Sequence, residues 1–290
     1  MRAEGSILFF HNPSVKDFIE SLIKDTPAFC LNILSSSKYI KQAHRLWGAL
    51  KDKDDTTPTA TLSQIKEPFI ATLLRLKDTP PLNDLTFASR CIFLVDVYCV
   101  YRKQELLDAA KEIITNIRSN ERMQESYSVD DWCALLAEAQ SMVVNAPSIM
   151  EVCNEAIQLI EQDPERISSL IEFREIATMM DSFKFSEGFQ KKFKNRFQLY
   201  VQQEAFYECR QIDNALEIED YLSDFKKLAR DLGISVRTEE EAIQDHLSET
   251  INHEDRNADD HDYDTHRERL LSYQDDERRI DLMFNDLIDR

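Results

Sequence analysis

The sequence predicts an all-α protein, an irregular helical-repeat-like array in the form of an α-solenoid or a bundle of antiparallel helix pairs. Only 4 of the 290 residues are glycine, whereas average usage would give roughly 20. Because tight hairpins and bulges depend on glycine for positive φ, this scarcity excludes turn-rich β architectures. Apolar residues recur at helical spacing in successive segments of about 12 to 20 residues joined by short connections. No fixed period matches tetratricopeptide, ankyrin or armadillo units, so no named repeat is predicted.

The first division of the chain is residues 1–50, where three helices are expected. Pro13 follows Asn12 and occupies the first helical position, which a ring without an N–H group favours. That helix should continue to about residue 23, the second should begin at Pro27, and the third should span Ser36 to Leu50. Residues 51–58 are polar, charged and end in proline, which marks the best internal boundary.

The second division, residues 59–236, is expected to be the helical array itself. Its connections contain proline, asparagine or glycine, and acidic residues occupy first turns, where the helix dipole favours them. The expected helices are Leu62–Leu76, Leu85–Tyr101, Gln104–Arg118, Val129–Asn145, Ser148–Glu161, Pro164–Met180, Glu187–Arg210 and Asn214–Leu232.

The third division, residues 237–290, is an acidic charged segment with a terminal amphipathic helix. Residues 259–264 (DDHDYD) are its most charged part, which is typical of a solvated helix or a disordered linker. The apolar residues that follow are expected to dock on the body of the protein or on another subunit. They are Ile280, Leu282, Met283, Phe284, Leu287 and Ile288.

Charge and hydropathy limit the partners and the location. The formal net charge of −19 repels phosphate, so we do not expect a nucleic-acid partner. The best apolar run, residues 91–95, is interrupted by Asp96, so no membrane partner is expected. No apolar signal-peptide region precedes Pro13, and we expect a cytoplasmic protein. The six scattered cysteines lack a C-x-x-C spacing and are predicted to be core residues.

Patterns that would carry catalysis are weak. Four isolated glycines supply neither a P-loop nor a G-x-G-x-x-G loop, so we predict no nucleotide cofactor. His11, Ser14 and Asp17 lie close together, but helix capping accounts for Ser14 and Asp17 better than a nucleophile does. We therefore predict a protein that is not an enzyme and has no cofactor.

One alternative is a metal-dependent hydrolase built on the C-terminal His/Asp cluster. His246, His253, His261 and His266 lie among many carboxylates, which are suitable ligands for divalent metals. Such a compositional cluster more often belongs to a charged, solvated segment, so no metal site is assigned.

Two further segments have a structural and a nucleic-acid interpretation. Residues 190–197 are the most basic stretch, and Phe189, Phe193, Phe197 and Tyr200 fall on one helical face. This pattern favours a core stripe with a solvated basic flank over an RNA-binding face. Residues 228–235 resemble the turn of a helix-turn-helix, but the following helix is acidic, so Gly233 is interpreted as a helix C-cap.

A motif near the N-terminus resembles a known family. Residues 7–18 (ILFFHNPSVKDF) resemble the F-x-H-x-S-x-x-[DE]-[FY]-L segment of STAND-type NTPases, which include NACHT-like and bacterial antiviral proteins. The matching positions are His11, Pro13, Ser14, Val15, Asp17 and Phe18. In that family the segment closes the winged-helix part of the ATPase module, and a helical sensor region follows. This sequence has no Walker A loop, so the position of His11 is carried over and its nucleotide-sensing role is not.

The resemblance implies a function for the whole chain. It indicates a non-enzymatic helical sensor or regulatory region of a STAND-type NTPase, with a winged-helix remnant within residues 1–50. The implied mechanism is protein–protein recognition, with bacterial antiphage defence as its setting. The implied partner is a phage protein or an ATPase module in cis or in trans. The alternatives are the metal-dependent hydrolase and an oligomeric helical scaffold.

Overall fold

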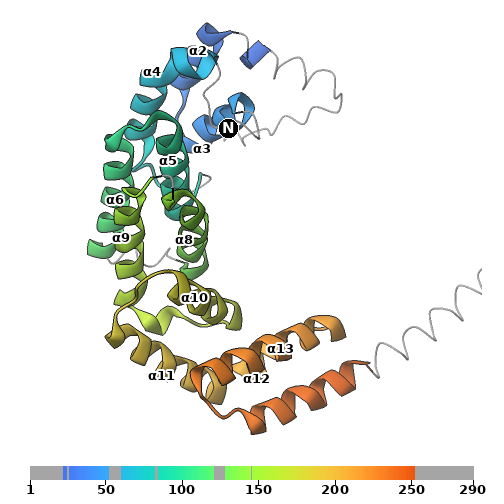
Figure 1. The fold of residues 1–290 in the computed structure, drawn as a ribbon. Helices are drawn as coiled ribbons and strands as arrows, with labels where there is room; N and C mark the ends of the chain where they lie inside the picture. Colours follow the sequence, from blue (N-terminus) through green and yellow to red (C-terminus); the bar gives the residue numbers. More distant parts are fainter. Residues whose placement is uncertain are drawn as a thin grey trace, which may run out of the picture. The chain divides into compact units, whose positions relative to one another are not determined.

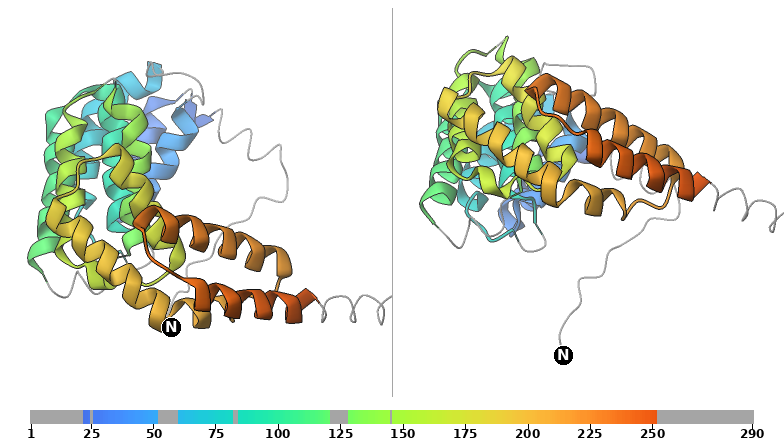
Figure 2. Two further views of the ribbon diagram at one scale, coloured as in Figure 1. Left: turned by 60° about the horizontal axis from the view of Figure 1, so that its bottom comes forward. Right: turned by 90° about the horizontal axis from the view of Figure 1, so that it is seen from below.

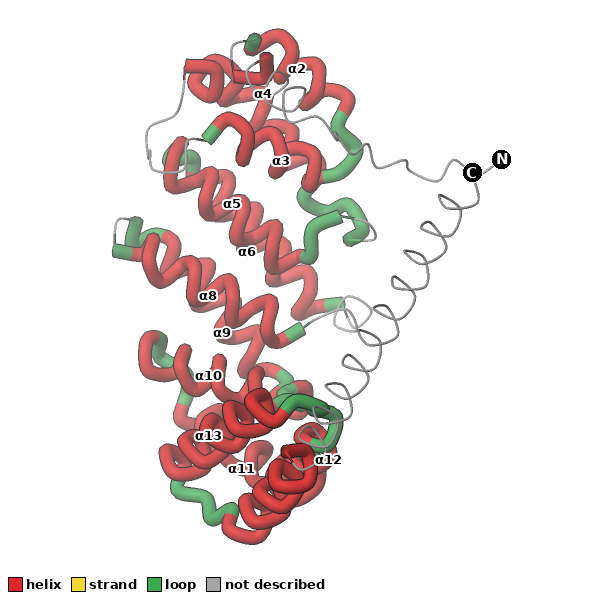
Figure 3. The backbone as a smooth tube through the Cα atoms, turned by 90° about the vertical axis from the view of Figure 1, so that its right-hand side faces the viewer, coloured by secondary structure: helices red, strands yellow, loops and turns green. Residues whose placement is uncertain are grey.

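A computed structural model describes residues 22–24, 26–51, 60–81, 84–120, 128–144 and 146–251. The secondary structure of these residues is helical, without a strand (Figure 3), which confirms the all-α prediction. The chain forms two compact units: unit 1 comprises Met1–Ile167 and Glu175–Lys192, and unit 2 comprises Ser168–Arg174 and Phe193–Arg290. Within the described ranges, every helix is too short or too polar to cross a membrane.

Unit 1 is built from stacked helices. Its complete described helices are α2 (Pro27–Ser36), α3 (Ile40–Leu50), α4 (Ala60–Leu76), α5 (Phe87–Tyr101), α6 (Gln104–Ser119), α8 (Val129–Val143) and α9 (Ile149–Gln162). Helix α5 packs on α6 and α8 packs on α9, while α5–α8 and α6–α9 contacts join the two pairs. Figure 1 shows α4, α6 and α9 on one side of this unit and α3, α5 and α8 on the other. The predicted array of helix pairs is therefore present in unit 1.

The apolar spacing of each helix explains its place in the stack. On α6, Leu106, Ala110, Ile113 and Ile117 recur at intervals of three and four residues, and all are buried. Helix α5 is apolar around most of its circumference, because it packs against α6 on one side and α8 on another. The turn between α5 and α6 is short and places Arg102 in the left-handed region at φ 56°.

Four aromatic residues fix α3, α4 and α5 to one another. The ring centroid of Trp47 lies 5.3 Å from that of Phe69, 6.3 Å from that of Phe93 and 5.6 Å from that of Tyr101. Phe69 and Phe93 meet edge to face at 6.2 Å. Such pairs add about 0.5–1.5 kcal/mol each beyond their burial. This cluster fixes the rotation of α3 about its axis, and therefore the direction in which its outer face points.

The connection between α4 and α5 is held by a buried arginine. The Arg90 side chain is fully buried, and its Nη2 lies 3.5 Å from Oδ2 of the equally buried Asp84 carboxylate. The guanidinium donates hydrogen bonds to the backbone carbonyls of Lys77 (2.8 Å), Leu85 (3.0 Å) and Thr79. One side chain thus satisfies three backbone carbonyls of this connection.

Asp84 also caps a helix that lies far away in the sequence. Its carboxylate accepts the backbone N–H groups of Ile40 at 3.0 Å and Lys41 at 2.8 Å, which open α3. It further accepts the N–H of Leu85 at 2.8 Å and the hydroxyl of Thr79 at 3.2 Å. A negative charge at a helix N-terminus is favourable, so the loop and α3 stabilise each other.

Unit 2 combines parts of two helices with the C-terminal helices. Helices α10 (Leu170–Ser182) and α11 (Glu187–Gln203) are divided between the units, and α12 (Ala205–Cys209), α13 (Ala215–Leu232) and a helix through residues 237–251 follow. Figure 2 shows α13 and residues 237–251 side by side in both views, joined by the Lys226–Glu240 ion pair at 2.5 Å. Gly233 ends α13 at φ 63°, which confirms the predicted C-cap.

The helix expected over Pro164–Met180 is interrupted. A 3₁₀ turn, η1 (Pro164–Arg166), precedes α10, which begins only at Leu170. The cause is a reciprocal cap, in which the Glu172 carboxylate accepts the N–H groups of Ser168 at 2.7 Å and Ser169 at 3.1 Å. Ser169 Oγ in turn accepts the N–H of Glu172 at 3.3 Å. The single-helix prediction was wrong at this point.

The helix expected over Glu187–Arg210 is also broken, at Glu204. Glu204 lies between α11 and α12 with non-helical backbone angles. Its carboxylate accepts a hydrogen bond from each Nη atom of Arg196, both at 2.9 Å. Because Arg196 is buried, this two-point ion pair anchors the break to the preceding helix.

Candidate functional site

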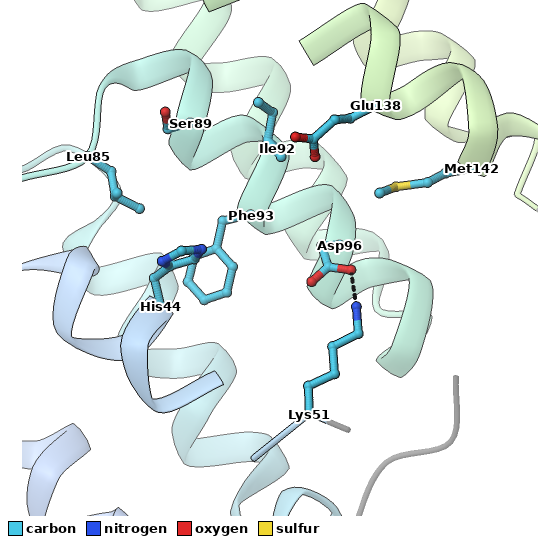
Figure 4. Close-up of a pocket in the computed structure, with 9 residues that line it drawn as sticks. All are labelled: His44, Lys51, Leu85, Ser89, Ile92, Phe93, Asp96, Glu138 and Met142. Carbon is cyan, nitrogen blue, oxygen red and sulfur yellow. Dashed lines mark hydrogen bonds and ion pairs between the residues drawn. The ribbon is translucent and has the colours of Figure 1, made fainter. Parts of the chain in front are cut away.

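Unit 1 has a groove of about 440 Å³ beside α5 (Figure 4). Its floor comes from α5, which contributes Ser89, Ile92, Phe93 and Asp96. Because these positions are three to four residues apart, they lie on one face of the helix over about two turns. Leu85, which the buried Asp84–Arg90 pair holds in place, extends the floor at one end.

The walls of the groove come from two other helices. Helix α3 contributes His44, its C-cap residue is Lys51, and α8 contributes Glu138 and Met142. The aromatic cluster fixes α3 on α4, and direct packing fixes α8 on α5, so both walls are attached to rigid parts of the unit. The groove is therefore formed before any ligand arrives.

One end of the groove carries a fully compensated charge. Oδ2 of Asp96 accepts the indole N–H of Trp47 at 2.7 Å, and Oδ1 lies 2.6 Å from Lys51 Nζ. The Lys51 ammonium also lies 6.0 Å from the centroid of the Trp47 ring, within reach of a cation–π interaction. These contacts explain why a carboxylate interrupts the apolar run of α5 at this position.

His44 is an exposed residue whose ring packs on the floor of the groove. Its ring meets Phe93 edge to face at 4.8 Å, with an interplanar angle of 86°. Burial against α5 lowers the pKa of His44 below its usual value, and the nearby Asp96 carboxylate offsets this only in part. At neutral pH the ring is therefore uncharged and offers one donor and one acceptor nitrogen.

The α8 wall carries the second carboxylate of the groove, Glu138. Glu138 and Met142 are four residues apart and lie on one face of α8. The Glu138 side chain is exposed and forms no ion pair with any residue in the described ranges. A cation placed beside an apolar group would complement this wall.

A second polar cluster lies inside unit 2. The Tyr200 hydroxyl donates to Glu208 at 2.5 Å and meets the Tyr221 hydroxyl at 2.7 Å, and Tyr221 donates to the carbonyl of Ala205 at 2.7 Å. The Glu208 carboxylate also accepts the N–H of Leu170 at 3.2 Å. Burial raises the pKa of Glu208 above its ordinary value. The cluster joins the start of α10 to α11, α12 and α13, which is a structural role.

Several sequence-predicted positions lie outside the described residues. They are the family-motif residues His11, Pro13, Ser14, Asp17 and Phe18, the histidines His253, His261 and His266, and the terminal segment Ile280–Ile288. His246 is described, on the helix of residues 237–251, and is half-buried. Across the described ranges, no three His, Cys, Asp or Glu side chains are placed to hold a metal ion together.

Two predictions about core residues are confirmed. Five of the six cysteines are buried, Cys99 is half-buried, and burial raises the pKa of Cys153 to about 11. Phe189, Phe193, Phe197 and Tyr200 are each at most 2% exposed. The lysines beside them are exposed as expected, but Arg196 is buried against Glu204 instead of belonging to a solvated flank.

The sequence did not identify the groove residues. Ser89, Glu138 and Met142 look like ordinary helix positions, and only Asp96, a charge within an apolar run, gave a local signal. Comparison with protein-family models, with curated proteins and with solved structures found no match to this chain. What the chain binds is therefore inferred from the groove and from the N-terminal motif.

Proposed function

We propose that this chain is a non-enzymatic sensor or regulatory region of a STAND-type NTPase, which acts by recognising a protein partner through its stacked helices. The observation that carries the proposal is the preformed groove of unit 1, with a floor from α5 and walls from α3 and α8. In stacked helix pairs the outer side chains vary without disturbing the core, which suits recognition of macromolecules.

The chemistry of the groove supports binding rather than turnover. Leu85, Ile92 and Phe93 are the apolar residues of its floor. A neutral imidazole, a carboxylate paired with Lys51, and a carboxylate without an ion pair to any described residue stand around them. Protein interfaces combine an apolar centre with a polar rim in this way. The polar groups come from three separate helices, and the Asp96 carboxylate is already engaged by Trp47 and Lys51.

The N-terminal motif supports the family part of the proposal. Residues 7–18 precede the helical array in this chain, as the corresponding segment precedes a helical sensor region in STAND-type NTPases. Partner binding to the array would then release an ATPase module, present in cis or in trans, for oligomerisation. A phage protein is the partner implied by bacterial antiviral members of the family.

The test begins with affinity purification of the full chain from cells with and without phage infection. The expected result is a protein that is enriched with the chain, and that forms a complex of fixed stoichiometry when both are purified and mixed. The matched control is a tagged chain carrying Asp84→Ala, which is expected to disturb the α3 cap of unit 1.

Two results would contradict the proposal. One is the absence of any reconstituted complex across infected and uninfected cells. The other is hydrolysis of a nucleotide or phosphoester by the purified chain with zinc or manganese, which Ala replacement of His253, His261 and His266 would abolish. The latter result would support the metal-dependent hydrolase instead.

A further inference from the structure

Gly48 on α3 has no role in the fold that the structure reveals. Glycine is among the poorest helix formers, and Gly48 lies inside α3 with an ordinary negative φ. A Cβ atom built on it would meet nothing within 4 Å. Neither a left-handed backbone nor a close neighbour within the described residues therefore requires glycine here.

The position of Gly48 connects it with the groove. It follows His44 by four residues, so the two lie on one face of α3, and Lys51 caps the helix three residues later. His44 and Lys51 line the groove, and Gly48, which lies between them in the sequence, leaves an open shelf on the surface of α3 where a side chain would stand. A glycine at a helix surface lets another helix approach at the short end of the usual interaxial range of about 8–10 Å.

The charges that line the groove indicate which chemical groups a ligand should carry. Asp96 is compensated by Lys51 and Trp47, so the exposed Glu138 carboxylate is the spare charge. Ile92 and Met142 line the same groove. A ligand that complements this pattern carries a cation close to an apolar side chain.

The backbone of the groove favours a helical ligand. The floor and both walls are α-helices, whose N–H and C=O groups are already paired within each helix. An extended peptide would find few backbone partners there, whereas a helix satisfies its own backbone hydrogen bonds. The floor spans about two turns of α5, a length that a short helix can match.

We propose that the groove binds an amphipathic α-helix of a partner protein. The helix lies along α5 between α3 and α8, approaches α3 most closely at Gly48, and packs its apolar ridge on the half-buried Ile92 and Met142. A Lys or Arg of the helix pairs with Glu138. This inference rests on the proposed function and names the partner's binding element.

The probe is a display library of 16-residue peptides with apolar residues at helical spacing and all other positions randomised. Selection uses the full, unchanged chain, and Gly48→Leu, whose added side chain projects into the open shelf, is kept for the affinity measurements. The enriched peptides are expected to share a Lys or Arg at one flank of the apolar ridge. Each should become helical on binding, as measured by circular dichroism.

Affinity measurements then locate the contacts. Gly48→Leu and Glu138→Lys are each expected to weaken binding of an enriched peptide at least tenfold, and Lys→Glu in the peptide should restore binding to Glu138→Lys. The matched control is Glu105→Lys, which reverses an exposed charge on α6, outside the groove, and should leave the affinity within twofold. Tryptophan fluorescence checks that Gly48→Leu remains folded.

The proposal is overturned if no peptide is enriched, if enriched peptides lack a cation, or if Gly48→Leu binds them as well as the unchanged chain. Failure of this proposal is distinguishable from failure of the proposed function. A reconstituted partner that binds Gly48→Leu and Glu138→Lys normally refutes the groove and leaves protein recognition intact. If peptides bind at the groove but no cellular partner is found, the groove stands as a helix-binding site and the proposed function fails.

Discussion

Replacing Asp84 with alanine should destabilise unit 1 more than any exposed substitution in the same loop. The Asp84 side chain is fully buried, and its carboxylate lies 3.5 Å from the equally buried Arg90 guanidinium. It also accepts the first N–H groups of α3, from Ile40 and Lys41. Alanine removes the cap and leaves the arginine charge buried without its counterion.

The expected loss follows from these contacts. An N-cap is worth about 0.5–2 kcal/mol, and removing one partner of a buried ion pair costs about 3–5 kcal/mol. The two figures describe the same carboxylate and overlap, so we expect a total of about 3–5 kcal/mol rather than their sum. Asp84→Asn keeps one acceptor oxygen and should fall between alanine and the unchanged chain.

The two tryptophans make this measurement specific to unit 1. Trp47 and Trp132 are the only tryptophans in the sequence, and both lie in unit 1. Urea unfolding followed by tryptophan fluorescence therefore reports this unit, while far-UV circular dichroism reports both units. The matched control is Asp78→Ala, in the same loop, whose exposed carboxylate pairs with Lys77. Such surface pairs are worth less than about 1 kcal/mol.

One outcome would refute this account of the loop. The account is refuted if the free energies of unfolding of Asp84→Ala and Asp78→Ala differ by less than about 1 kcal/mol. The stabilisation from the buried ion pair and the helix cap would then be no larger than the cost of removing both charges from water. The packing of α3 against α4 would then hold the helix in place without the cap.

Three further predictions concern other parts of the chain. The raised pKa of Glu208 means that the native state binds the carboxyl proton more tightly than the unfolded state does. Unit 2 therefore loses stability as pH rises above the ordinary pKa of 4.5 and through the raised one. Glu208→Gln, which does not titrate, should become increasingly more stable than the unchanged chain over that range, as measured by circular dichroism in urea. Cys99 should react first with a thiol reagent, and fully buried Cys91, whose pKa burial raises, should react only on unfolding; equal rates would contradict the packing. Gly48→Ala should raise the free energy of unfolding by about 0.5–1 kcal/mol, and a loss would mean that the shelf is not open.

Much of the fold could be predicted from local patterns. The spacing of apolar residues placed a helix over Gln104–Arg118, and the structure has Gln104–Ser119. The late start of α10 was also readable, because Ser169 and Glu172 form the S-x-x-E spacing of a capping box. The break at Glu204 was not, since it depends on an ion pair with Arg196, eight residues earlier.

The groove could not be predicted because its parts are distant in the sequence. His44, Asp96 and Glu138 are each separated by more than forty residues, and only the stacking of α3, α5 and α8 brings them together. The cap of α3 shows the same limit, since Asp84 follows Ile40 by 44 residues. Gly48 was a usable local signal, as an isolated glycine within a helical pattern indicates a close approach or a functional constraint.

The residues that support the groove are buried and those proposed to contact a partner are exposed, so stability and partner binding can be tested separately. Asp84 and Arg90 hold the loop that positions Leu85, and their loss should lower the stability of unit 1. Glu138 is exposed on the opposite wall and Gly48 faces open space, so changes at either should move the tryptophan-monitored unfolding curve by no more than about 1 kcal/mol. A variant that loses its partner while keeping that curve has therefore lost a contact, and a variant that loses both has lost the support of the groove.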